Sequence, residues 1–422
     1  MTSQSDLRNA AAPGVPYFTP HQSPPSGSAL PLSEQPVHKD KLPKLFEPLK
    51  IRDAVFPNRA FCAPMCMYSC ADGKLTDFHM VHLGGIAYKG AGLVMVEASS
   101  VRPEGRISPE DSGIWEDAQI EPLAKIATYV HSQGHHLSVQ LAHAGRKAST
   151  VAPWLAERGH SNTATAAVGG WPDNVVSSTT TPWSSDYPVP RMLSIAEIKD
   201  IVKAFGDAAV RAVKAGVDSI ELHAAHGYLL HQFLSTATNQ RTDEYGGSFE
   251  NRVRLVLEAI QEIRPRIPEG MPFFLRLSGT DWLDTAKYPG AWDIEQTIRL
   301  AKLLYPLGVD LLDVSSAGNH EEQKIPIHIK EYQTSLAGKV KKALIEEGGE
   351  AAKLLISAVG GITDGAQANQ ILEEGQVDAV FIAREFLRDS SFVMRAAKEL
   401  EVQVRWPVQY QRGTFGRVKP RM

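Results

Sequence analysis

Cysteine is scarce in this chain of 422 residues: only three occur, Cys62, Cys66 and Cys70, all within one short segment. An odd number of cysteines so close together does not make a disulfide framework, and no N-x-[ST] glycosylation acceptor is present. These absences favour a reducing, cytoplasmic setting. The C-x3-C-x3-C spacing departs by one residue from the C-x3-C-x2-C pattern of radical iron–sulfur enzymes, so we expect no metal there.

Long hydrophobic runs are also missing. The best apolar run, residues 93–96, is closed by Glu97, far short of the roughly 20 residues that span a bilayer. The N-terminus has no charged stretch followed by an apolar one, so it does not resemble a secretory signal. The net charge of −4 supplies no basic field, and we expect neither a membrane nor a nucleic acid as partner.

The common nucleotide and metalloprotease motifs are absent too. The chain has no GxxxxGK[ST] loop, no HExxH and no GxGxxG between a strand and a helix. The sequence therefore gives no indication of P-loop phosphoryl transfer, zinc-dependent hydrolysis or Rossmann dinucleotide binding.

Proline is concentrated at the start of the chain, where residues 1–43 carry eight of the 27. Serine and glycine lie between them, with almost no apolar periodicity, a composition typical of disorder. We expect a disordered extension over residues 1–43 and one folded domain over residues 44–422, which ends in a tail segment.

From Leu45 onward, short apolar runs rich in β-branched residues alternate with helical patterns. Near-continuous apolar strands joined by crossover helices predict a parallel sheet covered on both faces. Eight strands close a barrel, so an α/β fold of the (β/α)8 type is the simplest solution, with a doubly wound open sheet as the alternative. The predicted strands are Ala60–Pro64, Gly92–Ala98, His136–Ala142, Ser219–His223, Phe273–Ser278, Asp310–Ser315, Lys353–Val359 and Ala379–Ala383.

Helix boundaries are marked by capping residues. Ser194 and Glu197 form the S-x-x-E pattern of a capping box, and Gly216, Gly308 and Gly375 each follow a helical stretch and precede a strand. The helices predicted most clearly are Ser194–Ala215, Ser248–Arg264, Trp292–Leu307 and Asp364–Glu374.

The third loop after a strand, residues 147–193, is long and rich in Trp, Pro, Ser and Thr, with Trp154, Trp171 and Trp183 among them. Barrel chemistry takes place at the carboxyl ends of the strands and in the loops that follow. We therefore interpret this loop as a lid or a substrate wall.

Polar side chains cluster where the predicted strands end. Gly360 and Gly361 follow the seventh strand, and Arg384 follows the eighth. Bare backbone N–H groups and a permanent cation suit a barrel phosphate site. A surface ion pair is the alternative for Arg384.

Five motifs, in order along the chain, resemble the old yellow enzyme family, and most closely its bacterial YqjM-like branch. The resemblance extends from Leu45 to Arg412. The motifs are Ala63-Pro64-Met65-Cys66-Met67-Tyr68, Gln140-Leu141-Ala142-His143-Ala144-Gly145-Arg146, His223-Ala224-Ala225-His226-Gly227-Tyr228-Leu229, Arg241-Thr242-Asp243-Glu244-Tyr245-Gly246-Gly247-Ser248 and Gln409-Tyr410-Gln411-Arg412-Gly413.

The resemblance implies noncovalent FMN, reduced by NADPH. Reduction places negative charge at flavin O2 and N1, an edge to which the resemblance assigns Arg276, with Gln140 at the pyrimidine ring. The residues implied along the isoalloxazine are Ala63, Pro64, Met65, Cys66 and Ala98. The residues implied at the phosphate are Ser316, Gly360, Gly361, Ala383 and Arg384.

The resemblance further implies an ene-reductase, which reduces activated C=C bonds of α,β-unsaturated carbonyl or nitro compounds. His223 and His226 polarise the substrate oxygen, Tyr228 protonates the α-carbon, and Tyr68 closes over the substrate. Arg412 reaches into a neighbouring subunit's active site, which implies a homo-oligomer. Taken as bare sequence, Arg412 also suits a solvated tail.

Three alternatives stay open at this point. His223-x-x-His226 is also a pattern for metal ligation or a structural hydrogen-bonded pair, although no acidic or cysteine ligand lies nearby in sequence. Another type of FMN barrel would oxidise a hydroxy acid or a dihydropyrimidine. A non-catalytic barrel would bind flavin or a metabolite as a sensor or scaffold.

Overall fold

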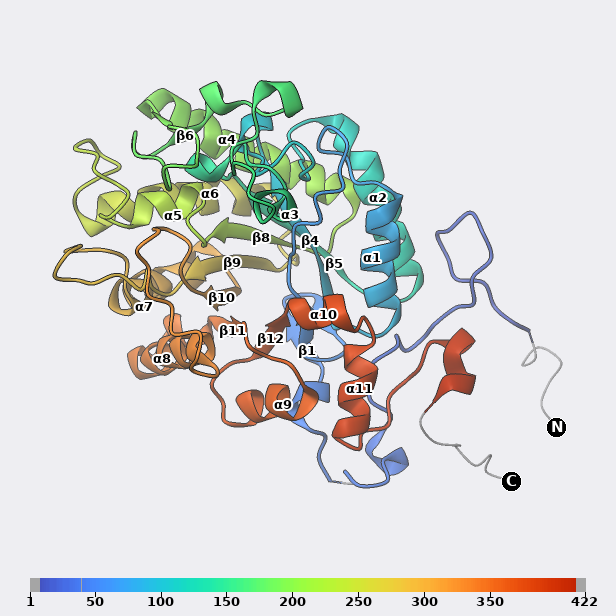
Figure 1. The fold of residues 1–422 in the computed structure, drawn as a ribbon. Helices are drawn as coiled ribbons and strands as arrows, with labels where there is room; N and C mark the ends of the chain where they lie inside the picture. The colour runs from blue at the N-terminus through green and yellow to red at the C-terminus, as the bar shows by residue number, and fades with distance from the viewer. Residues whose placement is uncertain (1–7, 39, 415–422) are drawn as a thin grey trace, which may run out of the picture.

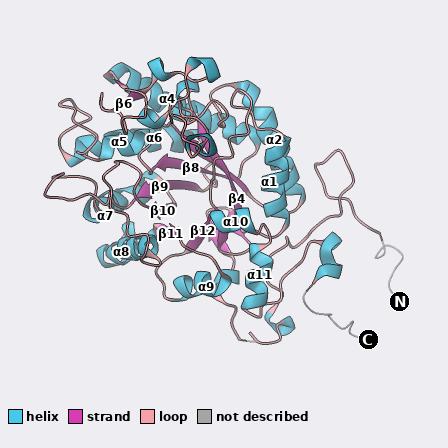
Figure 2. Cartoon of the chain, viewed as in Figure 1, coloured by secondary structure: helices cyan, strands magenta, loops and turns pink. Residues whose placement is uncertain are grey.

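Eight parallel strands close into a barrel in the computed structural model, which describes residues 8–38 and 40–414 (Figures 1 and 2). The predicted (β/α)8 architecture is confirmed. The open doubly wound alternative is wrong because the first strand of the barrel, β3, pairs with the last, β12. In barrel order the strands are β3 (Ala60–Cys62), β4 (Leu93–Ser100), β5 (Leu137–Ala142), β8 (Ser219–Ala224), β9 (Phe273–Ser278), β10 (Leu311–Ser315), β11 (Leu355–Val359) and β12 (Ala379–Ile382).

Helices surround the barrel and cover its outer face (Figure 1). The four predicted helices are confirmed within a few residues at their ends. Ser194 caps α4 by accepting the backbone N–H of Glu197, and Gly216 ends that helix with a φ of +87°, a conformation that glycine adopts without strain. The helices are α1 (Asp77–Tyr88), α2 (Ile120–Ser132), α4 (Ile195–Ala215), α5 (Leu229–Leu234), α6 (Phe249–Ile263), α7 (Ile294–Leu304), α8 (Tyr332–Glu347), α9 (Gly365–Glu373), α10 (Arg384–Arg388) and α11 (Phe392–Glu399).

The core has two layers. The larger one lies between the strands and the surrounding helices, and the smaller one fills the barrel with Phe61, Phe274 and Phe381. A hairpin of β1 (Leu49–Ile51) and β2 (Ala54–Phe56) joins the inner layer and closes the amino-terminal end of the barrel. The opposite end, where the strands finish, is left for a ligand.

The loop of residues 147–193 folds over that carboxyl end. It contains α3 (Pro153–Ala156) and a two-strand pairing of β6 (Val176–Ser177) with β7 (Arg191–Met192). Arg146 donates hydrogen bonds to the carbonyl oxygens of Thr181 and Pro182 in this loop and to that of Asn319, after β10. Arg146 thereby connects the loop after β5 with the end of β10.

The proline-rich extension differs from the expectation of disorder over its described part, residues 8–38 and 40–43. Ser26 is buried and donates a hydrogen bond to the Tyr88 carbonyl at the end of α1. Ala29 forms a bridge with Val404, far along the chain. Composition predicts too few apolar contacts for folding, but the segment is held by backbone hydrogen bonds to residues 403–405 and by side-chain hydrogen bonds to the barrel. Residues 1–7 lie outside the described residues.

No helix within residues 8–38 and 40–414 is long and apolar enough to cross a bilayer.

Candidate active site

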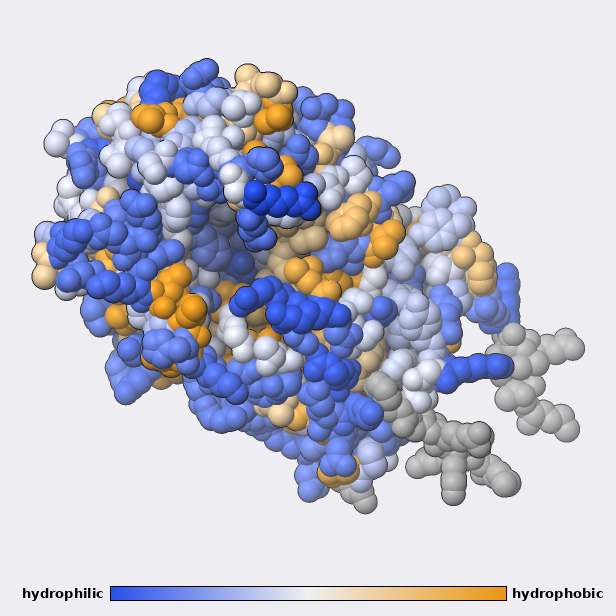
Figure 3. All heavy atoms as spheres, viewed as in Figure 1, coloured by the Kyte–Doolittle hydropathy of each residue, from blue (hydrophilic) through white to orange (hydrophobic). Residues whose placement is uncertain are grey.

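The predicted site residues, except Arg412, lie in the carboxyl-terminal half of the barrel strands or just after it. The face of the molecule in Figure 3 is hollowed near its centre, where this end of the barrel opens. Polar side chains from several strands surround the opening, as in barrel enzymes generally.

His223 is the last residue but one of β8 and is almost fully buried. Its Nδ1 accepts the backbone N–H of Ala225 at 3.2 Å, so the proton of the neutral ring lies on Nε2. Burial, then the positive charges of His226 and Arg276, lower its pKa well below the usual value. The only hydrogen bond of this ring among the described residues is the one to Nδ1, so the Nε2–H is left as a donor for a ligand.

His226 lies three residues on, with its ring 5.2 Å from that of His223. Its backbone has a left-handed φ of +59° and is held by Ser278, whose Oγ accepts the His226 N–H. Its Nε2 lies 2.7 Å from Ser315 Oγ. Burial, followed by the charges of Arg276 and Lys147, lowers the His226 pKa, so both histidines are neutral hydrogen-bonding groups near pH 7.

Tyr228 packs its ring against His223, with centroids 5.0 Å apart. Burial raises its pKa well above the usual value, so the phenol holds its proton at neutral pH. Lys147 Nζ lies 5.1 Å from the Tyr228 ring centroid and donates a hydrogen bond to the His226 carbonyl at 2.9 Å. Burial, then Arg146, lowers the Lys147 pKa to about 8.

Tyr68 follows β3 and adopts a left-handed φ of +51°. Its ring meets Trp154 of α3 edge to face at 5.4 Å, so the loop after β3 contacts the long third loop. Trp183 of the same long loop lies 5.4 Å from Lys147 Nζ and donates from Nε1 to the Gly318 carbonyl. Two tryptophans of the long loop thus lie beside Tyr68 and Lys147 at the carboxyl end of the barrel.

A buried ion network lies inside the barrel beneath the histidines. Arg276 is 4% exposed, and its Nε lies 2.6 Å from Asp313 Oδ2 and 3.4 Å from Glu221 Oε1. Gln140 donates to the same Glu221 oxygen at 2.7 Å. Burial alone lowers the Arg276 pKa, but Asp313 and Glu221 outweigh burial and raise it. Arg276 Nη2 is buried without a partner in the described structure, a donor that a ligand oxygen can satisfy.

The loop after β3 brings Ala63, Pro64, Met65 and Cys66 to the barrel mouth, and Ala98 lies on the neighbouring strand β4. Burial, then the charges of Asp111 and Glu97, raises the Cys66 pKa well above its usual value. Cys66 is therefore a neutral thiol, which is a weak nucleophile.

The predicted phosphate site lies at the ends of β10, β11 and β12. Gly360 and Gly361 have φ values of +107° and +72°, a conformation that other residues seldom adopt. Gln333 connects Ser316, whose Oγ donates to Gln333 Oε1, with the Val359 carbonyl. Ala383 directly follows β12, and Arg384 begins α10, exposed and without an ion pair among the described residues.

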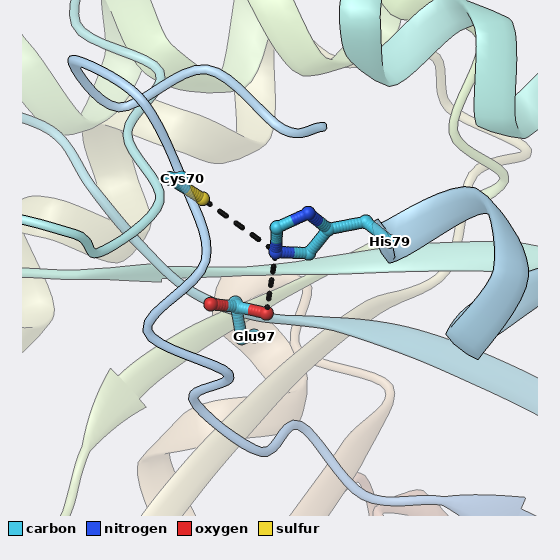
Figure 4. A group of neighbouring side chains, drawn as sticks. All are labelled: Cys70, His79 and Glu97. Atoms are coloured by element: carbon cyan, nitrogen blue, oxygen red, sulfur yellow. Dashed lines mark hydrogen bonds and ion pairs between the residues drawn. The ribbon is translucent and has the colours of Figure 1, made fainter. Parts of the chain in front are cut away.

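The buried group of Cys70, His79 and Glu97 places three potential metal ligands within 4.8 Å of one another (Figure 4). His79 Nδ1 accepts the Thr76 backbone N–H at 3.0 Å, so the ring proton lies on Nε2. That proton points at Glu97 Oε2, 3.2 Å away, whose other oxygen accepts the Met67 N–H. His79 Nε2 also lies 3.6 Å from Cys70 Sγ, so the three side chains connect α1 and β4 with the loop after β3.

Arg412 is the predicted site residue that the structure does not bring to the others. It is exposed in a short 3-10 helix, η12 (Val408–Gly413), that contacts the end of α1 through a hydrogen bond from Tyr88 to Gln409.

The family described as NADH:flavin oxidoreductase / NADH oxidase matches residues 44–403. The chain belongs to this family. An NADH:flavin oxidoreductase of Gibberella zeae is 47% identical over 420 residues, which cover 98% of this chain and 97% of that protein. An NADPH dehydrogenase of Bacillus subtilis is 41% identical over 373 residues, 88% of this chain and 99% of that protein.

The solved structure of an old yellow enzyme homologue from Zymomonas mobilis is similar with a TM-score of 0.67 and 26% identity. The match covers 86% of this chain and 94% of that one. The resemblance to the old yellow enzyme family is thereby confirmed, and the protein is a flavin-dependent NAD(P)H oxidoreductase.

The residues present fit FMN. The unpartnered Arg276 Nη2 is a buried donor at the predicted O2 and N1 edge, and Gly360, with a φ of +107°, leaves its backbone bare at the predicted phosphate end. Arg384 adds an exposed cation that forms no salt bridge among the described residues.

Several supporting residues escaped the sequence prediction. Glu221 and Asp313 are charges inside otherwise apolar strands, a signal that was available and points to the barrel interior. Lys147 directly follows the second motif. Gln333 lies in the first turn of α8, 17 residues after Ser316, and nothing in the sequence marks it.

Proposed function

We propose that the protein is an ene-reductase that acts on α,β-unsaturated carbonyl or nitro compounds. The observation that carries the proposal is the group at the end of β8: two neutral histidines beside a protonated, buried tyrosine. A hydroxy-acid or dihydropyrimidine oxidase needs a lysine or histidine base, and burial makes both of these histidines weak bases.

His223 and His226 bind the substrate oxygen. Each neutral ring keeps one N–H, and His223 directs its Nε2–H to the site because Nδ1 is occupied by the Ala225 N–H. Ser315 can donate to His226 Nε2 while it accepts from Gln333 Nε2, which leaves the His226 proton on Nδ1. Two such donors stabilise the negative charge that develops on the oxygen as the alkene is reduced.

Tyr228 supplies the proton to the α-carbon. Its high pKa keeps the phenol protonated, and its position against His223 places it next to the bound oxygen's donors. Lys147, over the Tyr228 ring, stabilises the phenolate left after proton transfer through a cation–π contact. Tyr68, held against Trp154, closes over the substrate.

Noncovalent FMN, reduced by NADPH, would supply the hydride at the β-carbon. Arg276 and Gln140 would hold its pyrimidine edge, and Ala63, Pro64, Met65, Cys66 and Ala98 its ring system. Ser316, Gly360, Gly361, Ala383 and Arg384 would hold the phosphate. Denaturing the purified protein tests this assignment: all the yellow colour should leave as FMN, whereas FAD in the supernatant or colour kept on the chain refutes it.

The proposal includes a homo-oligomer in which Arg412 enters a neighbouring copy's site. A guanidinium is permanently charged and planar, which suits contact with carbonyl oxygens at a flavin face. Arg412→Ala and His223→Ala subunits, each impaired alone, should restore some activity when they are mixed under conditions that allow exchange. A fully active Arg412→Ala variant, or a monomer at working concentration, rules out the shared site.

We expect the enzyme in the cytoplasm, because Cys62, Cys66 and Cys70 are free thiols.

A further inference from the structure

The extension and the C-terminal segment form one hydrogen-bonded ladder. Gly27 N–H donates to the Arg405 carbonyl at 2.8 Å, and Arg405 N–H donates to that of Ser28 at 2.7 Å. Leu30 N–H donates to the Gln403 carbonyl at 2.9 Å, next to the antiparallel bridge of Ala29 with Val404. The ladder joins residues some 375 positions apart and lies directly before η12.

Two buried glutamine side chains of the extension bind the same segment. Gln35 is 3% exposed; its Oε1 accepts the Gln403 N–H and its Nε2 donates to the Gln403 carbonyl. Gln22 is 7% exposed, and its Oε1 accepts the Val408 N–H at the start of η12. The two primary amides take the place of a neighbouring strand. The N–H and carbonyl of Gln403 and the N–H of Val408 thereby have hydrogen-bond partners in the extension.

The ladder lies at the amino-terminal end of the barrel. Ser26 contacts Tyr88, at the end of α1, and His135, just before β5. Gly27 packs so closely on Gly90, before β4, that a Cβ would lie 2.3 Å from the Gly90 oxygen. Helix ends that precede strands lie opposite the strand ends that hold the site. In Figure 1 the C-terminal segment of residues 403–413, drawn in red after α11, accordingly lies beside α1 and α11, outside the ring of helices.

This position separates Arg412 from the active site of its own chain. The Tyr410 side chain beside it is 47% exposed, although its ring meets Tyr88 edge to face at 5.0 Å. Arg412 makes no ion pair among the described residues. A guanidinium held in a fixed, exposed place without a partner suits a contact with a second copy of the chain.

We propose that residues 19–35 are a brace that orders segment 403–413 and so presents Arg412 to the active site of a second copy. The proposal rests on the shared site described under Proposed function. Gln22 and Gln35 are positioning residues in this scheme, because they act through the segment and touch no substrate. The brace removes the conformational freedom of the segment before association, so the contact with the second copy is made at lower entropic cost.

The test compares four full-length holoenzymes with wild type: Gln22→Ala/Gln35→Ala, Arg412→Ala, the triple variant, and Gln370→Ala as control. Gln370 bonds only to Glu374 on the exposed side of α9, far from the ladder in sequence. Two quantities are measured for each: hydrogen exchange of the amides in segment 403–413, and KM and kcat for 2-cyclohexenone.

We expect faster exchange at Gln403 and Val408 in the glutamine double variant, with FMN content unchanged. Its KM should rise by roughly tenfold, as for loss of one hydrogen bond to a charged group, and match the rise in Arg412→Ala. The triple variant should show no further rise, because both changes remove the same contact. The Gln370→Ala control should match wild type in both measurements.

Unchanged exchange in the glutamine double variant overturns the brace. Faster exchange with an unchanged KM also overturns it, if Arg412→Ala raises KM. If Arg412→Ala leaves KM unchanged, the shared site fails, and the exchange measurement alone then decides whether the extension orders the segment.

Discussion

Replacing His226 separates the loss of a hydrogen-bond donor from the loss of a backbone conformation. His226→Ala removes one of two donors to the substrate oxygen and places alanine at a φ of +59°, where a β-carbon is disfavoured. Loss of one preorganised donor at a site of developing charge costs about 2.7–4 kcal/mol, or about 10²- to 10³-fold in rate. His226→Asn is the matched variant, since asparagine tolerates the left-handed region and keeps an N–H donor.

The assay is stopped-flow reoxidation of the reduced flavin by 2-cyclohexenone, with flavin reduction by NADPH recorded separately. His226→Ala should slow reoxidation by about 10²- to 10³-fold, and His226→Asn should recover most of that loss. His223→Ala should resemble His226→Ala, because its Nε2–H is the other donor. Reoxidation of His226→Ala at the wild-type rate refutes the polarising role, and an Asn variant as slow as Ala refutes the donor argument.

Three further predictions concern a proton donor, a thiol and a stabilising carboxylate. Tyr228→Phe should slow reoxidation by about 10²- to 10⁴-fold and leave flavin reduction by NADPH intact; abolished flavin reduction contradicts its role as acid. Cys66→Ala should remain active with a shifted flavin potential, because the buried thiol is neutral; complete loss of activity with flavin bound reverses that conclusion. Burial raises the Asp218 pKa, but hydrogen bonds from His131 and His136 lower it overall to about 2, below its ordinary 3.8. Its stabilisation is therefore present above about pH 4 and lost as the pH falls through about 2. Asp218→Asn should lower the free energy of unfolding by about 2 kcal/mol at pH 5, as measured by urea titration. The difference in unfolding free energy between the variant and wild type should become smaller toward pH 2. A difference that does not change with pH contradicts this prediction.

The barrel was predictable because its strands are short apolar runs bounded by glycine and capping residues. Ser194 and Gly216 mark both ends of α4 by local chemistry alone, and the structure places them accordingly. The extension was not predictable, since its order comes from hydrogen bonds to residues near position 400. The local composition of the extension does not reveal partners that lie so far away in the sequence.

For the site, sequence motifs located the residues that face a ligand but not those that orient them. His223, His226 and Tyr228 occur in one motif at the end of one strand. Ser315, Gln333 and Lys147, which hold or face them, come from other strands and loops. Their roles depend on barrel closure and on side-chain direction, which no spacing in the sequence encodes.

The central claim is that reduced flavin in this protein passes its electrons to an activated alkene. The direct test is an anaerobic titration of the yellow protein, followed at the flavin absorbance maximum. NADPH should bleach the flavin, and 2-cyclohexenone should then restore the colour in a one-to-one ratio, with cyclohexanone as product. Bleached flavin that excess enone leaves reduced, but that oxygen reoxidises, contradicts the claim.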